Sequence, residues 1–205
     1  MYKNRKIVAI VVAAGSGTRL GGPLPKQFLK VGSRTILEMS VAAFEQDECV
    51  DEIIIAANPE YMELTEKTCA GFRKVTNIVP GGAERQDSVR AALSCVLGAE
   101  EPAGAAGEPL VLVHDAARPF VTQEVIDAVI ETAAEYGAVV PVVPVKDTVR
   151  QLSGGSACHA EVLCGTPSCT LDRSTLVSVQ TPQGFFAQTL KSAMENAKKI
   201  GRAHV

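Results

Sequence analysis

A glycine-rich segment near the N-terminus holds the residues best suited to chemistry. Residues 15–26 read Gly-Ser-Gly-Thr-Arg-Leu-Gly-Gly-Pro-Leu-Pro-Lys. Glycines allow a ligand to approach the backbone, free amide N–H groups bind anions, and the cations Arg19 and Lys26 neutralise negative charge. This combination predicts a polyphosphate site. The alternative is a plain turn with two solvated cations, which we would favour for a bare Gly-x-Gly pair.

Two common phosphate-binding loops do not fit this segment. The dinucleotide fingerprint needs a glycine where Leu20 stands, and the P-loop needs Lys-Ser or Lys-Thr where Pro23 and Leu24 stand. The remaining pattern is Gly-x-Gly-x-Arg followed by Pro25-Lys26. It resembles the signature of nucleotidyltransferases, which join a nucleoside triphosphate to a phosphorylated or sugar partner.

The pair His114-Asp115 follows the apolar run 110–113 directly and brings a carboxylate to the end of that strand. Ligands of open α/β sheets bind at the carboxyl ends of the strands, so we expect Asp115 beside the glycine-rich segment. Magnesium usually takes one or two carboxylates together with phosphate oxygens. We therefore interpret Asp115 as a magnesium ligand. The alternative is that Asp115 caps the turn and pairs with Arg118.

The elements that must position these residues alternate between apolar strands and amphipathic helices. Helix starts are marked by a capping box at 35–38, by Asn58-Pro59 and by Thr122. The alternation predicts an α/β fold with a mostly parallel sheet flanked by helices. The expected strands are 7–14, 52–57, 75–79, 110–113 and 138–143, and the expected helices are 35–44, 59–69, 85–97, one after Thr122, and 186–200.

The alternation breaks between residues 144 and 173, where the chain is polar and rich in Gly, Ser and Cys. Strand-like pieces at 147–152 and 161–164 flank a Gly-Gly turn, which predicts a protruding β-arm, and 176–180 is expected to return to the core. A two-stranded excursion is marginally stable alone in water. We expect two copies of the arm to pair about a two-fold axis, giving a homodimer.

Length and composition narrow the class of protein. A chain of 205 residues fits one sizeable domain, and the net charge of −3 gives no footprint for nucleic acid or an anionic membrane. The apolar run near the N-terminus is too short for a secretion signal or a membrane span. We expect a soluble cytoplasmic protein whose six cysteines are free thiols. The alternative is a metal site at Cys158, Cys164 and Cys169 near His159, although their spacing matches no Cys-x-x-Cys zinc pattern.

Seven segments, in order along the chain, together resemble the 2-C-methyl-D-erythritol 4-phosphate cytidylyltransferase family. The resemblance implies a Rossmann-like nucleotide-diphospho-sugar transferase fold. It also implies a reaction of CTP with methylerythritol phosphate that gives a CDP-alcohol and pyrophosphate in non-mevalonate isoprenoid synthesis. The segments are 13–20, 25–27, 81–88, 114–119, 144–148, 172–173 and 180–183.

The resemblance also implies roles for single residues. Arg19 and Lys26 would hold the phosphates and stabilise the transition state, and Asp115 would bind Mg²⁺ and substrate. The acceptor phosphate would meet Thr148 and the catalytic Arg173, which reach across to the partner subunit's site, and Thr181 would line the site. The cytosine and ribose would be surrounded by Ala13, Ala14, Gly15, Gly82 and Ser88.

The sequence departs from the family pattern at two places, and two other functions remain as alternatives to the cytidylyltransferase. Ala83 replaces a frequent acid, and the chain ends at Val205 before a Thr-Asp stretch and an Asn-Ile-Lys segment that the family carries, so its C-terminal part is expected to be missing. The first alternative is a ribitol-5-phosphate cytidylyltransferase, which shares the sequence pattern of residues 23–28. A non-catalytic nucleotide-binding module is the rival from another class.

Overall fold

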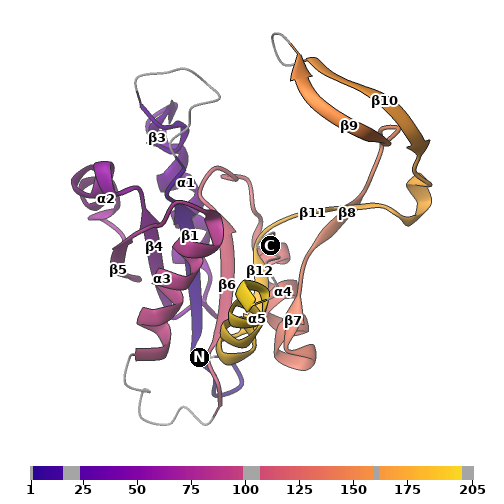
Figure 1. The fold of residues 1–205 in the computed structure, drawn as a ribbon. Coiled ribbons are helices and arrows are strands. Elements are labelled where there is room, and N and C mark those ends of the chain that lie inside the picture. The colour runs from indigo at the N-terminus through magenta and orange to yellow at the C-terminus, as the bar shows by residue number, and fades with distance from the viewer. Residues whose placement is uncertain (1, 16–23, 99–106, 159–161, 200–205) are drawn as a thin grey trace. The chain divides into compact units, whose positions relative to one another are not determined.

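The computed structural model describes residues 2–15, 24–98, 107–158 and 162–199. Contacts divide the chain into two compact units, residues 1–141 with 181–205 and residues 142–180 (Figure 1). Each unit is described by itself below. Within the described residues no helix is both long enough and apolar enough to cross a membrane.

The first unit is built on a six-stranded sheet with the order β5-β4-β1-β6-β12-β7 (Figure 1). β1, β4, β5 and β6 are parallel, and β12 runs antiparallel to both β6 and β7. The predicted α/β class and mostly parallel sheet are confirmed. The strands are β1 Ile7–Ala13, β4 Glu52–Ala57, β5 Val75–Pro80, β6 Leu110–Asp115, β7 Ala138–Val139 and β12 Gln183–Phe186.

Helices cover both faces of this sheet, which explains why the central strands are continuous apolar runs. Side chains alternate along β1: Ile7, Ala9 and Val11 join one core cluster, whereas Val8 and Ile10 join the other. The first cluster packs under α1 Ile36–Gln46, α2 Met62–Cys69 and α4 Gln123–Tyr136. The second packs under α3 Arg85–Gly98 and α5 Ala187–Lys199.

Local signals set the helix starts. The predicted capping box is present: the Thr35 hydroxyl accepts the Glu38 N–H at 3.1 Å, and the Glu38 carboxylate accepts the Thr35 N–H at 2.6 Å. Asn58 caps the short helix η3 Pro59–Tyr61 that leads into α2. Thr122 stands at the N-cap of α4 as expected, but its side chain accepts no capping bond. Ahead of α1 lie η2 Lys26–Phe28 and the hairpin of β2 Lys30–Val31 with β3 Arg34–Thr35.

Two strand predictions were wrong at the boundary between the units. The expected strand 138–143 is divided by Pro141, which has no N–H for a ladder, into β7 and β8 Val142–Pro144. The expected return of 176–180 to the core does not occur, because β11 Val177–Val179 pairs with β8 in the second unit and is exposed. The chain enters the sheet one strand later, at β12.

Gly184 shows why β12 was missed. A Cβ at this position would lie 2.8 Å from Val129 and 2.9 Å from Ala133, so glycine lets α4 pack directly on the strand. The four-residue strand begins just after Pro182 and lacks any periodic pattern. A short strand of this kind is recognised by its neighbours rather than by its own sequence.

The second unit contains two antiparallel pairs. One is β8 with β11, and the other is β9 Arg150–Cys158 with β10 Val162–Thr170. A two-stranded excursion was predicted, but the turn expected at Gly154-Gly155 was wrong: both glycines lie inside β9, so the strands are longer than the predicted pieces. The helix η4 Arg173–Thr175 follows, capped by the Asp172 carboxylate.

Candidate functional site

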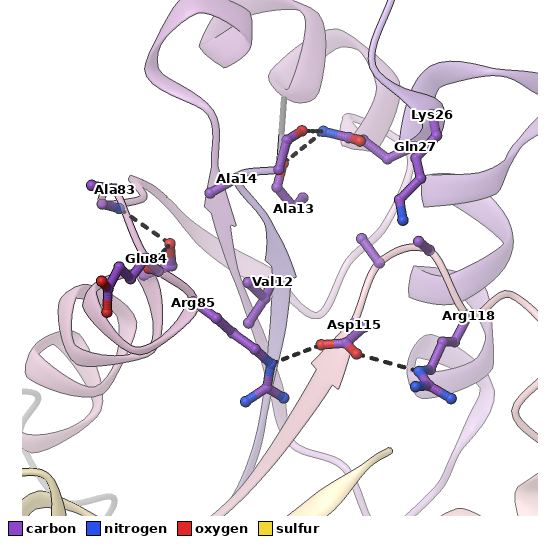
Figure 2. A pocket seen from close by; sticks show the side chains of 15 residues that line it. Val12, Ala13, Ala14, Lys26, Gln27, Ala83, Glu84, Arg85, Asp115 and Arg118 are labelled. Carbon is purple, nitrogen blue, oxygen red and sulfur yellow. Dashed lines mark hydrogen bonds and ion pairs between the residues drawn. The ribbon is translucent and has the colours of Figure 1, made fainter. Parts of the chain in front are cut away.

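A cavity of about 480 Å³ opens at the carboxyl ends of β1 and β6 in the first unit. It is lined by three chain segments together with Lys26 and Gln27 (Figure 2). The segments are 12–15 at the end of β1, 82–85 with Ser88 around the start of α3, and 115–118 at the end of β6. The expected sheet edge is therefore where the cavity lies. Seven predicted site residues meet there: Ala13, Ala14, Gly15, Lys26, Gly82, Ser88 and Asp115.

The remaining predicted site residues lie elsewhere. Arg19 falls within 16–23, outside the described residues. Thr148 and Arg173 belong to the second unit, where the Arg173 guanidinium donates to the carbonyl of Lys146 at 2.7 Å. Thr181 is buried and is not among the residues that line the cavity. Its hydroxyl instead supports the loop after β6.

One wall of the cavity is the backbone that leaves β1. The Gln27 side chain, which is buried, donates to the carbonyl oxygens of Ala13 at 2.7 Å and Gly15 at 3.0 Å (Figure 2). Lys26, beside it on η2, is exposed and lines the cavity. The strand end and the lysine are thus held together by one amide.

A second wall is the turn that enters α3. The Gly82 N–H donates to the buried Ser88 hydroxyl at 3.1 Å, and that hydroxyl donates to the Glu84 carbonyl at 3.3 Å. A Cβ on Gly81 would lie 2.4 Å from the Ala14 Cβ, so only glycine allows this turn to touch the first wall. Ser88 therefore shapes the turn as well as facing the cavity.

Asp115 on the third wall is held between two arginines. The Arg85 Nε donates to Oδ1 at 3.0 Å and the Arg118 Nε to Oδ2 at 3.3 Å, from opposite sides (Figure 2). Arg85 also donates to the Gln183 side chain at 3.3 Å. Burial alone would raise the pKa of Asp115, but the two guanidinium groups outweigh it and hold that pKa below its ordinary value.

Sequence reasoning treated Arg118 only as the partner of a turn residue and overlooked Arg85. The available signal was the position of Arg85, which begins the helix after β5 and therefore stands at the same sheet edge as Asp115. With Lys26, three cations and the two carboxylates of Asp115 and Glu84 line the described cavity. A local positive excess inside a chain of net charge −3 suits an anionic ligand.

His114 fixes the loop that carries Asp115. Its ring is fully buried, packs edge-on against Phe44 and interacts through both nitrogens. Nδ1 lies 3.0 Å from the Thr181 hydroxyl, and Nε2 lies 3.1 Å from the Arg118 carbonyl oxygen. A carbonyl can only accept, so Nε2 carries the hydrogen and the Thr181 hydroxyl donates to Nδ1. Burial lowers the pKa of His114 to about 4, which keeps the ring neutral.

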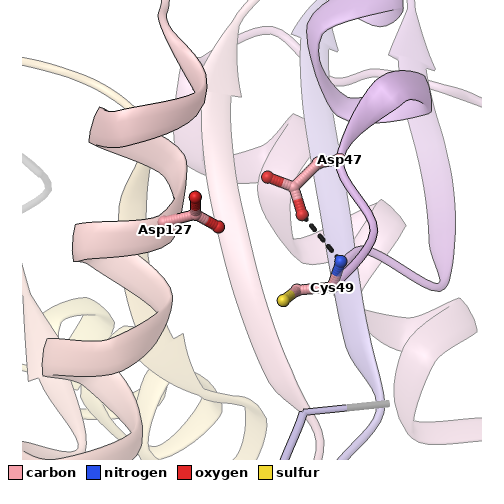
Figure 3. Close-up of side chains that lie close together, drawn as sticks. All are labelled: Asp47, Cys49 and Asp127. Carbon is pink, nitrogen blue, oxygen red and sulfur yellow. Dashed lines mark hydrogen bonds between the residues drawn. The ribbon is translucent and has the colours of Figure 1, made fainter.

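A second cluster of potential metal ligands lies away from the cavity, where Asp47, Cys49 and Asp127 each offer an atom within 4.8 Å of the others (Figure 3). The Asp47 Oδ1 already accepts the N–H groups of Cys49 and Val50, at 2.8 and 3.2 Å. Burial raises the pKa of both Asp47 and the Cys49 thiol. The Asp47 carboxylate thus closes a turn, and the raised pKa keeps the Cys49 thiol protonated and poorly suited to bind a metal. We therefore interpret the cluster as structural.

Comparisons with known proteins agree with the geometry. The family model for 2-C-methyl-D-erythritol 4-phosphate cytidylyltransferase (IspD) matches residues 7–204. The protein of that name from Chlorobium phaeovibrioides is 40% identical over 200 residues, which cover 95% of this chain and 78% of the relative. The one from Symbiobacterium thermophilum is 42% identical over 191 residues, covering 93% of this chain and 73% of the relative.

Two solved structures have a similar fold. The crystal structure of 2-C-methyl-D-erythritol 4-phosphate cytidylyltransferase from Thermus thermophilus is 34% identical, with a TM-score of 0.63 over 95% of this chain and 77% of that one. A crystal structure of 4-diphosphocytidyl-2C-methyl-D-erythritol synthase is 30% identical, with a TM-score of 0.70 over 96% of this chain and 85% of that one.

Proposed function

The chain belongs to the 2-C-methyl-D-erythritol 4-phosphate cytidylyltransferase family, and we propose that it joins CTP to methylerythritol phosphate and releases pyrophosphate. This is a nucleotidyltransferase reaction in the synthesis of isoprenoid precursors. The observation that carries the proposal is the cavity that gathers seven residues predicted from sequence for this chemistry. A cytoplasmic location goes with it, because CTP is a cytoplasmic metabolite.

The reaction asks for little covalent work from the protein. A phosphate oxygen of methylerythritol phosphate attacks the α-phosphorus of CTP in line with the departing pyrophosphate. The P–O bond to the pyrophosphate breaks as the new one forms, and the electron pair leaves with the pyrophosphate. The attacking oxygen is already anionic at neutral pH, so no general base is required. Catalysis then consists of positioning and charge stabilisation.

The three walls supply these two functions. The backbone of Ala13, Ala14 and Gly15 and the Gly82–Ser88 turn form a narrow surface with little side-chain bulk for the cytidine. Lys26, together with Arg19, is proposed to hold the triphosphate and stabilise the charge that develops on its oxygens. The positive excess of the cavity supports this assignment.

Asp115 fits a magnesium ion of the kind that takes one protein carboxylate and completes its shell with phosphate oxygens and water. It is 31% exposed and lines the cavity. We propose that it holds Mg²⁺, which when bound would neutralise charge on the phosphates. Arg85 and Arg118 compete with the ion for the two carboxylate oxygens, so they set how readily Asp115 accepts a metal.

The acceptor side of the proposal involves the second unit. Arg173 is exposed, and its planar guanidinium can hold a phosphate with two hydrogen bonds. The valines of β8 and β11, Val142, Val143, Val177 and Val179, are between 45 and 55% exposed. A two-stranded ribbon with apolar side chains in water is marginal alone. We propose that the ribbons of two subunits pair in a homodimer, in which Thr148 and Arg173 serve the partner's acceptor site.

A turnover assay tests the function directly. Pyrophosphate release is followed with CTP and Mg²⁺, and with methylerythritol phosphate or ribitol 5-phosphate as the acceptor. We expect turnover that is much faster with methylerythritol phosphate. Faster turnover with ribitol 5-phosphate would identify that compound as the acceptor instead. CTP binding without turnover would indicate a non-catalytic nucleotide-binding module.

A further inference from the structure

We infer that Gln27 is a positioning residue for the nucleotide half of the site, because its amide sets the direction of the backbone that leaves β1. The inference rests on the proposed function, in which that backbone faces the nucleotide. It is carried by the two hydrogen bonds of Gln27 to Ala13 and Gly15.

Both hydrogens of the amide are used. An amide nitrogen has two N–H donors, and Gln27 Nε2 directs them at two carbonyl oxygens, 2.7 and 3.0 Å away. The residue is 3% exposed, so water contributes little to satisfying these groups. Fourteen and twelve residues separate Gln27 from its two partners, which means that the bonds join η2 to the end of β1.

The position of the Ala13 carbonyl explains why it needs a side-chain donor. The pairing of β1 with β4 ends at Ala13, opposite Ala57, and its pairing with β6 ends one residue earlier. Beyond the last rung β4 and β6 no longer donate hydrogen bonds to the carbonyls of this backbone, and Ala13 is itself buried. A buried carbonyl without a donor destabilises the fold, because it has lost its hydrogen bonds to water. The Gln27 side chain therefore supplies the donor that a neighbouring strand would supply within the sheet.

Because the peptide unit is planar, fixing the Ala13 carbonyl also fixes the direction of the next N–H group. The carbonyl of one residue and the N–H of the next point in opposite directions across a trans peptide. Because the Ala13 carbonyl points at Gln27, the N–H of Ala14 points away from it. Ala14 also lines the cavity. Gln27 thus keeps an amide donor available to the nucleotide, while its neighbour Lys26 stays at a fixed spacing from that donor.

The test replaces the amide by an isosteric group that cannot donate when ionised. In Gln27→Glu two carbonyl oxygens face a carboxylate, so the backbone must turn. We expect kcat/KM for CTP to fall by about a hundredfold, the cost of roughly 1 Å of misplacement. The KM for the acceptor should stay within about twofold, because the change lies on the nucleotide side.

Gln123→Glu is the matched control. Gln123 also donates its amide to a backbone carbonyl, that of Ala43 at 2.7 Å, but it lies outside the cavity. The control should resemble the wild type in kcat/KM for CTP. If Gln27→Glu keeps the wild-type kcat/KM, or if both variants lose it equally, the positioning role is overturned.

Amide hydrogen exchange separates this inference from the proposed function. In the wild type without nucleotide, a peptide that covers residues 7–15 should exchange more slowly than in Gln27→Glu, with no such difference for Gln123→Glu. An inactive wild type would refute the proposed function, and the exchange result would still decide whether Gln27 holds this backbone. Equal exchange in the wild type and Gln27→Glu would overturn the inference.

Discussion

The cavity of the first unit and the ribbons of the second differ in how they place polar and apolar groups. Around the cavity, Gln27, Ser88, His114 and Thr181 are buried, and each has a hydrogen-bond partner. In the ribbon of β8 and β11 the valines are half-exposed. The hydrogen bond from the Arg173 guanidinium to the Lys146 carbonyl is also exposed to water. One region buries its polar groups, and the other exposes its apolar ones.

This difference follows from the cores. Both hydrophobic clusters of the described residues draw all their members from the first unit, and none from 142–180. Buried hydrogen bonds are stable when surrounding packing fixes both partners. The first unit can therefore hold reacting groups rigidly by itself, whereas the second has apolar surface for which we propose a partner subunit.

Replacing Arg19 or Lys26, the two cations of the glycine-rich segment, should cause the largest loss of activity. In Lys26→Ala or Arg19→Ala we expect kcat to fall by about a hundredfold or more, the usual cost of losing one preorganised donor to transition-state charge. Steady-state kinetics with saturating CTP measures the loss. Lys30→Ala is the control, because Lys30 is exposed on β2 and does not line the cavity. Near-normal kcat in a folded double variant would remove these cations from the mechanism.

Acid should weaken the buried network that supports Asp115. The folded pKa of His114 is about 4 and its ordinary value is 6.5. Between these values the unfolded chain binds a proton that the folded chain excludes, so the free energy of unfolding falls as pH falls from 6.5 to 4. The full difference corresponds to about 3 kcal/mol.

Urea unfolding at several pH values between 7 and 4 measures this slope. His114→Asn should lack that part of the slope, and the comparison cancels the contributions of the other groups, including Asp47 with its raised pKa. Parallel pH profiles in the wild type and the variant would show that His114 is protonated freely in the folded state.

Removing the charge of Asp115 should affect the metal response. In Asp115→Asn we expect the Mg²⁺ concentration for half-maximal activity to rise by about tenfold, since one anionic ligand is lost and the amide binds a hard cation weakly. Circular dichroism should show an intact fold. A wild-type magnesium response in this variant would leave Asp115 as the partner of Arg85 and Arg118 alone.

Subunit mixing gives the smallest change and tests the second region. Lys26→Ala and Arg173→Ala proteins are each expected to be weak, and an equal mixture that exchanges subunits should recover about a quarter of wild-type activity. Half of the dimers are then mixed, and one of their two sites has both residues. Absence of recovery despite demonstrated exchange would refute shared sites, and a monomer at micromolar concentration would refute the dimer.

Local patterns determined the helices α1 to α5 and the four parallel strands of the first unit. β4 has the predicted bounds, 52–57, and α1 begins at the predicted capping box, because apolar runs and capping boxes act over a few residues. The residues at the end of β1 and Asp115 could be assigned to one sheet edge, because parallel strands end at the same edge. That edge is where Ala13, Gly15 and Lys26 meet Asp115.

Tertiary structure alone decided how the site is held. The bonds of His114 to Thr181, Arg85 to Asp115 and Gln27 to Ala13 join residues 67, 30 and 14 positions apart. β12 depends in the same way on the strands that lie alongside it, β6 and β7. A hydrogen bond between distant side chains forms only when the packing of whole elements brings them within about 3 Å, and no local pattern encodes that distance.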